Sequence, residues 1–174
     1  MDDTNDKKPI ALAPPTDVYP IPNTGISEIL GLLEVLDDRQ GKEKVYTLAR
    51  DLQMEFGQLL LVIKAAEVLE FVYTPGTDVV LKALGKKMIE IDMNSKKKIL
   101  LQQLRRLPLF RVAKEKLVEA ENHKLAKTEV LELLKSLLPR ERPELVFETL
   151  INWGRWGEFL GYSQDDGYVY LDQG

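Results

Sequence analysis

Apolar residues recur along most of the chain with the three-to-four-residue spacing of amphipathic helices. The spacing begins at Ile26 and predicts a first helix that ends at the polar run 37–41. A short second helix over 45–52 and a longer third helix over 56–69 follow. The segment 69–81 then changes to β-branched and aromatic residues on both sides of a Pro-Gly turn, which predicts a β-hairpin.

The same order of elements recurs about ninety residues later. Pro108 begins a helix, a short helix then ends at Pro139, and Pro143 opens a longer helix that is predicted to end near Leu160. Residues 160–171 repeat the hairpin pattern around an Asp-Asp-Gly turn. Three helices followed by a hairpin form the element order of a winged helix. We therefore predict a mainly α fold with small β-hairpins (α+β), built of tandem winged-helix units joined by a helical connector.

Prolines and basic residues suggest the boundaries of these units. Residues 1–23 hold five of the nine prolines and show no helical or strand period, so we expect an extended tail or linker. The first unit is expected over 24–93, including a short helix after its hairpin. A basic helical connector over 94–107, capped by Ser95, would join it to the second unit over 108–174.

Composition restricts the class of protein without revealing a function. With no cysteine, the chain has no disulfide, no thiolate metal ligand and no Cys nucleophile. No apolar run reaches the roughly 18 residues that span a bilayer. The N-terminus lacks the basic and apolar regions of a signal peptide. We therefore expect a soluble cytoplasmic protein.

The net charge of −4 conceals an uneven distribution of charge. Residues 82–116 carry eleven Lys or Arg against three Asp or Glu, a net of +8, so the remainder carries −12. Solvated helix faces are the simplest interpretation. A surface for anionic lipid headgroups, nucleic acid or an acidic partner is the alternative. The connector supplies the candidate basic surface, which consists of Lys96, Lys97, Lys98, Arg105 and Arg106.

The sequence lacks the residue sets of the common catalytic and metal sites. His123 is the only histidine, which excludes the usual zinc sites and leaves a Ser-His-Asp set without support. The Leu-Gly-Lys-Lys run at 84–87 lacks the first glycine and the hydroxyl of a P-loop. The aspartates 165–166 stand at a turn, where Asp is favoured for local hydrogen bonding. We expect no enzymatic activity, no cofactor and no metal.

The third helix of each unit argues against nucleic-acid binding, the obvious function of a winged helix. The stretch 55–70 contains one Lys and one Gln against three Glu. The corresponding helix of the second unit offers Asn152 and Arg155 against three Glu. Its hairpin turn carries Asp165 and Asp166, where phosphate contacts would require Lys or Arg.

Both tryptophans lie close together near the C-terminal end. On a helix that begins at Pro143, Trp153 falls on the apolar arc and is predicted to be in the core. Trp156 points away from the centre of that arc, so it either packs under the hairpin beside a tyrosine or stands at an interface. Trp, Tyr and Arg are favoured interface residues. The candidate interface consists of Arg155, Trp156, Tyr168 and Tyr170.

Three stretches, in this order along the chain, resemble segments of a known domain. They are GISEILGLLEVLDDRQGKEKVYTLARDLQMEFGQLLLVIKAAEVLEFV, VLKALGKKMIEID and INWGRWGEFLGYSQDDGYVYLD. The domain is the AAA-associated C-terminal domain, which follows the ATPase domain in ABC transporter subunits of the nitrate, sulfonate and bicarbonate type. The resemblance covers residues 25–172 and rests on the collinear pattern rather than on one motif. Residues 84–87 lack the Thr-Pro that the domain has before the glycine.

The resemblance implies a non-enzymatic regulatory or assembly module that contacts the ATPase or membrane subunits of an importer on the cytoplasmic face. It is compatible with homo-oligomers and with peripheral contact to an anionic membrane surface. The family supplies no catalytic residues. No ATPase precedes the matching residues, so the sequence is a separate protein or part of a longer one, and the transported substrate does not carry over. Two alternatives stay open, a winged-helix nucleic-acid-binding regulator and a domain that senses a small anion.

Overall fold

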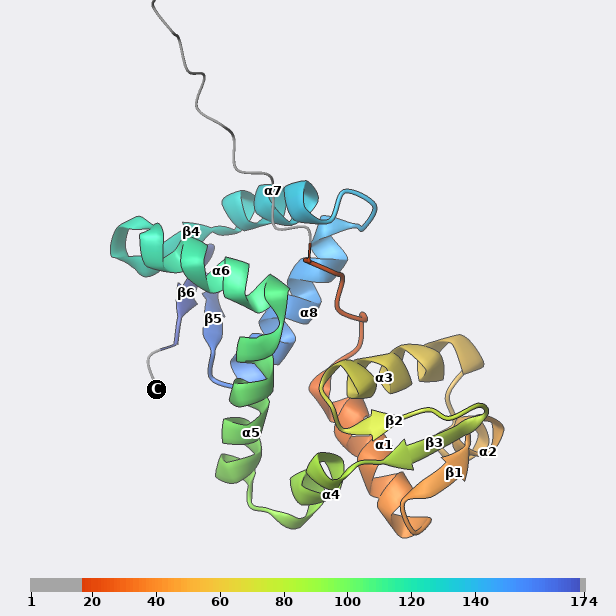
Figure 1. Ribbon diagram of the computed structural model, residues 1–174. Helices are drawn as coiled ribbons and strands as arrows, with labels where there is room; N and C mark the ends of the chain where they lie inside the picture. Colours follow the sequence, from red (N-terminus) through yellow and green to blue (C-terminus); the bar gives the residue numbers. More distant parts are fainter. Residues whose placement is uncertain (1–16, 173–174) are drawn as a thin grey trace, which may run out of the picture.

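The computed structural model describes residues 17–172 as eight α-helices and two small β-sheets (Figure 1). The first unit contains α1 (Ile26–Asp38), β1 (Lys42–Lys44), α2 (Val45–Asp51), α3 (Phe56–Val68), β2 (Val72–Tyr73) and β3 (Asp78–Leu81). The expected range of the first unit also includes the helix α4 (Ala83–Glu90), and the helix α5 (Met93–Arg106) covers the expected connector. The second unit contains α6 (Pro108–Glu119), the 3-10 turn Glu121–His123, β4 (Lys124–Ala126), α7 (Lys127–Leu137), α8 (Pro143–Trp156), β5 (Leu160–Ser163) and β6 (Tyr168–Leu171). The expected mainly α fold with small hairpins is confirmed.

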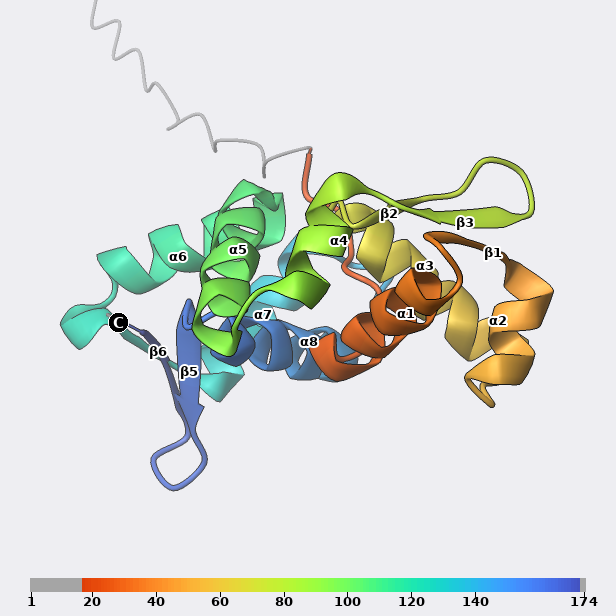
Figure 2. The same cartoon turned by 90° about the horizontal axis from the view of Figure 1, so that it is seen from below.

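The two sheets have the same topology. Each has three antiparallel strands, in the orders β1-β3-β2 and β4-β6-β5, so the last strand of each unit lies in the middle. The register pairs Lys44 with Asp78 in the first sheet and Ala126 with Tyr168 in the second. The hairpin β5–β6 projects from the body in the view from below (Figure 2). The first strand of each sheet was not predicted from the sequence, because three residues are too short to show an alternating pattern.

Two helix ends differ from the sequence-based expectation. The last helix ends at Trp156 rather than near Leu160, and the chain turns through Glu158, which has a positive φ of 53°. The N-cap of α5 is Asp92 and not Ser95. The Asp92 carboxylate accepts hydrogen bonds from the Ser95 amide at 3.0 Å and the Ser95 hydroxyl at 2.7 Å. The aspartate satisfies the otherwise unpaired amide of the first turn, and its negative charge suits a helix N-terminus.

The buried side chains of both units form one continuous core, which reaches from Ile21 to Val169. The start of α1 is fastened to α8: the Asn152 side-chain oxygen accepts a hydrogen bond from the Ile26 amide at 3.0 Å. The buried Trp153 donates its indole N–H to the Thr24 carbonyl at 2.7 Å. A second link joins α5 to the first unit, where the Gln103 amide donates to the Leu69 carbonyl at 3.0 Å.

Close packing around α8 requires glycine at two positions, Gly154 and Gly157. A Cβ at Gly154 would lie 2.5 Å from the Leu160 side chain, and one at Gly157 would lie 2.9 Å from the Leu104 side chain. Because real Cβ atoms do not approach so closely, these glycines let β5 and α5 pack directly on α8. The end of α8 is therefore fixed in place between these two elements.

The proline-containing start of the chain is described only from residue 17. Residues 1–16 of the expected tail lie outside the described residues. Beyond them, Asp17 forms an ion pair with Arg111 at 3.3 Å, Ile21 is buried, and Asn23 accepts a hydrogen bond from Thr149 at 2.8 Å. Residues 17–23 thus pack along the second unit before α1 begins. Within 17–172, no helix combines the length and apolar character needed to cross a bilayer.

Candidate functional site

An open groove lies where α5, α7, α8 and β5 meet, with a volume of about 750 Å³. This volume falls in the range of ligand and peptide sites. The groove brings together Arg155 and Trp156 from the candidate interface with Lys97 from the candidate basic surface. It also contains three residues that sequence reasoning did not select, Lys127, Phe147 and Tyr162. We call it the α8 groove.

Aromatic rings form one wall of the α8 groove. The rings of Phe147 on α8 and Tyr162 on β5 meet edge to face, with their centroids 5.3 Å apart and their planes at 90°. Phe147 is 4% exposed, so it is a fixed part of the core, whereas Tyr162 is half-buried. Such perpendicular contacts are favourable for aromatic quadrupoles and fix the orientation of both rings.

Two cations rest on this aromatic wall. The Lys127 ammonium lies 5.0 Å from the centre of the Phe147 ring and 5.9 Å from that of Tyr162. The Arg155 guanidinium lies 5.9 Å from the centre of the Tyr162 ring and donates a hydrogen bond to the Tyr162 carbonyl. The aromatic ring that Arg155 faces therefore belongs to Tyr162.

A third cation of the groove is already paired. Lys97 on α5 forms an ion pair with Glu158 at 2.8 Å, just beyond the end of α8. Trp156 lies half-buried in the groove, while Trp153, three residues earlier, is fully buried. The core position predicted for Trp153 is confirmed, and Trp156 is accessible beside Arg155.

The other two candidate interface residues lie elsewhere. Tyr168 and Tyr170 alternate with the buried Val169 on β6 and are 43% and 38% exposed. The Tyr170 ring covers Gly161 of the neighbouring strand, where a Cβ would lie 2.5 Å from the ring. Neither tyrosine lines the α8 groove. The structure therefore separates the four candidate residues into two pairs, and their role in binding stays a prediction.

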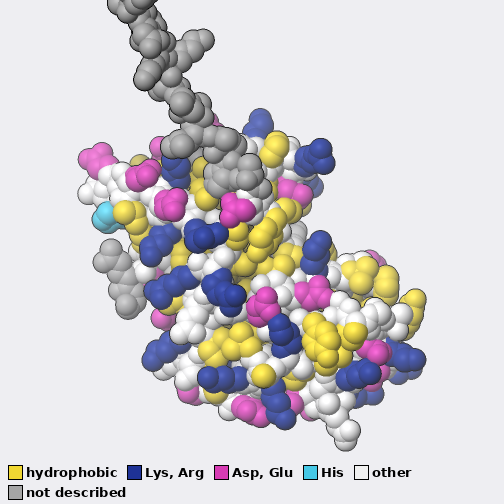
Figure 3. All heavy atoms as spheres, in the orientation of Figure 1, with side chains coloured by type: hydrophobic (Ala, Val, Ile, Leu, Met, Phe, Trp, Pro, Cys, Tyr) yellow, Lys and Arg dark blue, Asp and Glu magenta, His cyan; other side chains and the backbone are white. Residues whose placement is uncertain are grey.

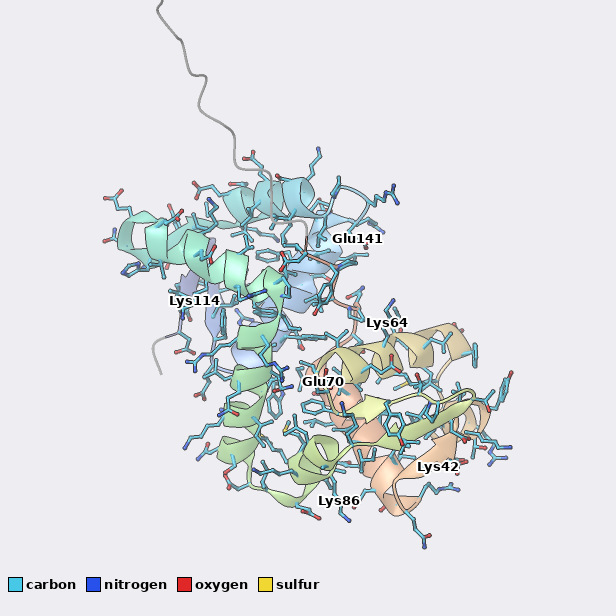
Figure 4. All side chains as sticks on the ribbon, viewed as in Figure 1. Lys42, Lys64, Glu70, Lys86, Lys114 and Glu141 are labelled. Carbon is cyan, nitrogen blue, oxygen red and sulfur yellow. The ribbon has the colours of Figure 1, made fainter. Side chains whose placement is uncertain are left out.

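The candidate basic surface belongs to a wider set of cations. Lys96 and Lys97 are half-buried, whereas Lys98, Arg105 and Arg106 are exposed on α5. Dark blue side chains over α4, α5 and α6 share one side of the molecule in Figure 3. Lys86 on α4 and Lys114 on α6 mark its two ends in Figure 4. We use the name basic face for the exposed cations of these three helices that form no ion pair among residues 17–172, which are Lys86, Lys87, Lys98, Arg105, Arg106 and Lys114.

The acid Glu70 lies close to two of the cations near the basic face, Lys82 and Arg106. Glu70 accepts a hydrogen bond from the Lys82 ammonium, and this bond, with the charges of Lys82 and Arg106, lowers the pKa of Glu70 against the opposing effect of burial. The carboxylate therefore stays ionised at neutral pH and neutralises part of the local positive charge. It lies between Lys86 and Lys114 in the view of Figure 4.

The described residues offer no set of side chains for metal or nucleophilic chemistry. No group of three or more His, Asp or Glu residues within 17–172 is placed to hold a metal ion. His123 is exposed, and its Nδ1 lies 3.1 Å from the Val118 carbonyl. At the hairpin turn, Asp166 bonds Ser163, in keeping with the structural role expected for this aspartate.

In a winged helix, the helices α3 and α8 would bind DNA, but here their side chains make other contacts. Asn152, one of the few side chains able to bind a base edge, is bonded to the Ile26 amide. On α3, the exposed residues Phe56 and Leu60 are 46% and 44% accessible, and Phe56 stacks on Tyr46 at 5.8 Å. An apolar outer face suits protein contacts better than phosphates.

The three groove residues missed from the sequence lie far apart along the chain. The site forms only when the folded chain brings these residues together. A local sequence pattern therefore could not predict that Phe147 contacts Tyr162. The position of Lys127 in the sequence could have indicated a functional contact. It is the first residue of α7, where a positive charge opposes the helix dipole. A cation at an unfavourable helix position is a reason to look for a contact elsewhere.

Comparison with known protein families gives a match that covers most of the chain. A family model described as the C-terminal AAA-associated domain matches residues 46–163. The matched segment runs from α2 to β5, so it contains α5, α7, α8 and the groove between them. Comparisons with curated proteins and with solved structures found no match.

Proposed function

The chain belongs to the C-terminal AAA-associated domain family, and from this premise we propose that it is a non-enzymatic accessory module of an ATPase. It would regulate or assemble an ABC importer ATPase of the nitrate, sulfonate or bicarbonate type through protein–protein contacts on the cytoplasmic side of the membrane. The family match supports the association with an ATPase. The transporter type follows from the sequence resemblance.

The observation that carries the proposal is the composition of the α8 groove. Trp156, Tyr162 and Arg155 are residue types that dominate binding energy at protein interfaces. They surround a concave surface whose shape is fixed by the packing of α8 against α5 and β5. A docking role requires such a pre-formed surface and no reacting group.

Co-purification with the ATPase and membrane subunits of the importer tests the proposal. We expect the chain to retain the ATPase and to change its rate of ATP hydrolysis. Trp156→Ser should weaken retention, whereas Tyr73→Ser, a change of an exposed aromatic residue outside the groove and outside the candidate interface, should leave it unchanged. Failure of the wild-type chain to bind any subunit, together with an unchanged ATPase rate, would reject the proposal.

The basic face favours a second, weaker contact with anionic lipid headgroups. Its cations extend over three helices, and each Lys or Arg near an anionic bilayer contributes about 1 kcal/mol. Sedimentation with vesicles should show binding when phosphatidylserine is added to phosphatidylcholine. The double variant Lys98→Gln, Arg105→Gln should weaken it more than Lys44→Gln, Lys124→Gln, which removes the same charge elsewhere. Equal losses would show that only net charge matters.

A further inference from the structure

Two cations of the α8 groove, Lys127 and Arg155, form no ion pair with an acid among residues 17–172. Among residues 17–172, every ion pair within 4.0 Å involves other residues than Lys127 and Arg155. Lys97, the third cation, is compensated by Glu158 at 2.8 Å. The acid that lines the groove, Glu148, is not within ion-pair distance of either cation. With Lys97 and Glu158 neutralising each other, Lys127 and Arg155 against Glu148 leave the groove with a net charge of +1.

The two charges are held near each other by the aromatic wall. Each lies 5.9 Å from the centre of the Tyr162 ring, so their separation is at most about 12 Å. The contact with an aromatic ring orients a cation without neutralising its charge. Arg155 is held further by the Tyr162 carbonyl, and the guanidinium has five N–H groups with which to bind an anion.

Apolar surface lies directly beside these charges. Ile151 and Phe147 are 6% and 4% exposed and line the groove, Trp156 is half-buried there, and Met93 is 53% exposed at its α5 side. A ligand with carboxylates alone would leave this surface in water. The lining instead matches a ligand that carries negative charge next to an apolar side chain.

We propose that the α8 groove binds an extended acidic peptide segment with an apolar or aromatic residue beside its carboxylates. In an extended chain, side chains two residues apart point to the same side at a spacing of about 6.6 Å, so two successive carboxylates on one side reach two cations no more than about 12 Å apart. The inference rests on the proposed function in one respect, that the segment belongs to the partner ATPase.

The two tryptophans provide a direct measurement on the full-length chain. A ¹⁵N-labelled sample has two indole N–H signals, one from Trp153, buried and bonded to Thr24, and one from Trp156 in the groove. The probe is the peptide acetyl-Phe-Ser-Glu-Ser-Glu-Ser-Phe-amide, which reads the same in both directions. We expect it to shift the Trp156 signal saturably and to leave the Trp153 signal in place.

Two further ligands and two variants of the chain identify the chemistry. The same peptide with Gln for Glu should bind about tenfold more weakly. Phenylacetate, a free aromatic carboxylate, should bind far more weakly than the peptide. Lys127→Gln changes an exposed residue at the start of α7 and should weaken binding of the acidic peptide about fivefold. Lys124→Gln, an equal change in charge three residues away, should not.

Several results would overturn the inference. They are an unmoved Trp156 signal, equal binding of the Gln peptide, equal weakening by Lys124→Gln and Lys127→Gln, and binding of phenylacetate as tight as that of the peptide. The last result would identify a small-molecule site instead. Retention of the ATPase by wild type and Lys127→Gln alike, with no peptide binding, would leave the accessory function intact and place the contact outside the groove.

Discussion

At the scale of single residues, the two tryptophans of α8 have opposite roles although they are three positions apart. The helical arc places Trp153 in the core, and the structure confirms that it is fully buried. Its hydrogen-bond partner could not be predicted, because the Thr24 carbonyl lies 129 residues away along the chain. Trp156 contributes instead to the surface of the α8 groove.

Replacement of the buried tryptophan tests this division. Trp153→Phe removes the donor to the Thr24 carbonyl, and an unsatisfied buried acceptor costs about 1–3 kcal/mol of unfolding free energy. The same change at Trp156 removes no protein hydrogen bond among residues 17–172 and should cost less than about 1 kcal/mol. Urea unfolding curves of both variants measure the difference. Equal losses would contradict the separate roles.

The cap of α5 should show a characteristic dependence on pH. Hydrogen bonds from the Ser95 hydroxyl and then from its amide lower the pKa of Asp92 below its ordinary value of 3.8. Because the folded-state pKa is the lower one, the stabilisation is present above the ordinary value. It is lost as the pH falls from about 4 through the folded-state pKa. Asp92→Asn should therefore destabilise the protein at pH 7 and have a smaller effect at pH 3. The measurement is the difference between the urea midpoints of the wild-type protein and of Asp92→Asn. If this difference is the same at pH 7 and pH 3, the charge of the carboxylate does not stabilise the helix.

At the scale of elements, apolar spacing was sufficient to predict the helices and the hairpins. The short strands β1 and β4 were not predicted. The sequence of β1, Lys-Glu-Lys, has no alternation of apolar and polar residues, and it forms a strand by pairing with β3. The helix cap shifted from Ser95 to Asp92 because both are capping residues within one turn. Two residues of the α8 groove, Arg155 and Trp156, are neighbours along the chain and were selected from the sequence. Tyr162 lies beside them only in the folded structure.

The close packing of α4 on the first hairpin can be tested with a glycine. A Cβ at Gly85 would lie 2.3 Å from the Phe71 carbonyl oxygen, so Gly85→Ala must displace the helix and should cost at least about 1–3 kcal/mol. Gly31 on α1 has nothing within 4 Å of its Cβ position, and Gly31→Ala should stabilise by about 0.5–1 kcal/mol. Thermal melts of the two variants should move in opposite directions. A stabilised Gly85→Ala would contradict the packing.

At the scale of the whole molecule, the two units predicted from the repeated pattern share one core. The two sheets have the same order of strands, and the repeated sequence pattern carries no information on how α1 meets α8. The junction of α1 with α8 depends on Asn152 and Trp153, and the junction of α5 with the first unit depends on Gln103. The partners of all three side chains are backbone groups of distant residues. Because almost every residue carries the same backbone groups, a hydrogen bond to the backbone does not require a particular residue type at the partner position, and a sequence pattern does not reveal it.

The shared core predicts a single cooperative unfolding transition. Because the hydrogen bonds and apolar contacts between the units are buried, opening one unit would expose part of the other. In differential scanning calorimetry, we expect the calorimetric and van't Hoff enthalpies of the full chain to agree. Two resolved transitions, or a van't Hoff enthalpy near half the calorimetric one, would show that the units unfold independently.

The contact between Arg155 and the Tyr162 carbonyl also bears on solubility. In the order β4-β6-β5, the strand Leu160–Ser163 lies at the border of its sheet, where unpaired backbone groups are a template for strands of other molecules. The guanidinium occupies one of these carbonyls and places a charge on the border. We therefore expect Arg155, which we propose to bind an acidic partner, also to hinder the pairing of β5 with strands of other molecules.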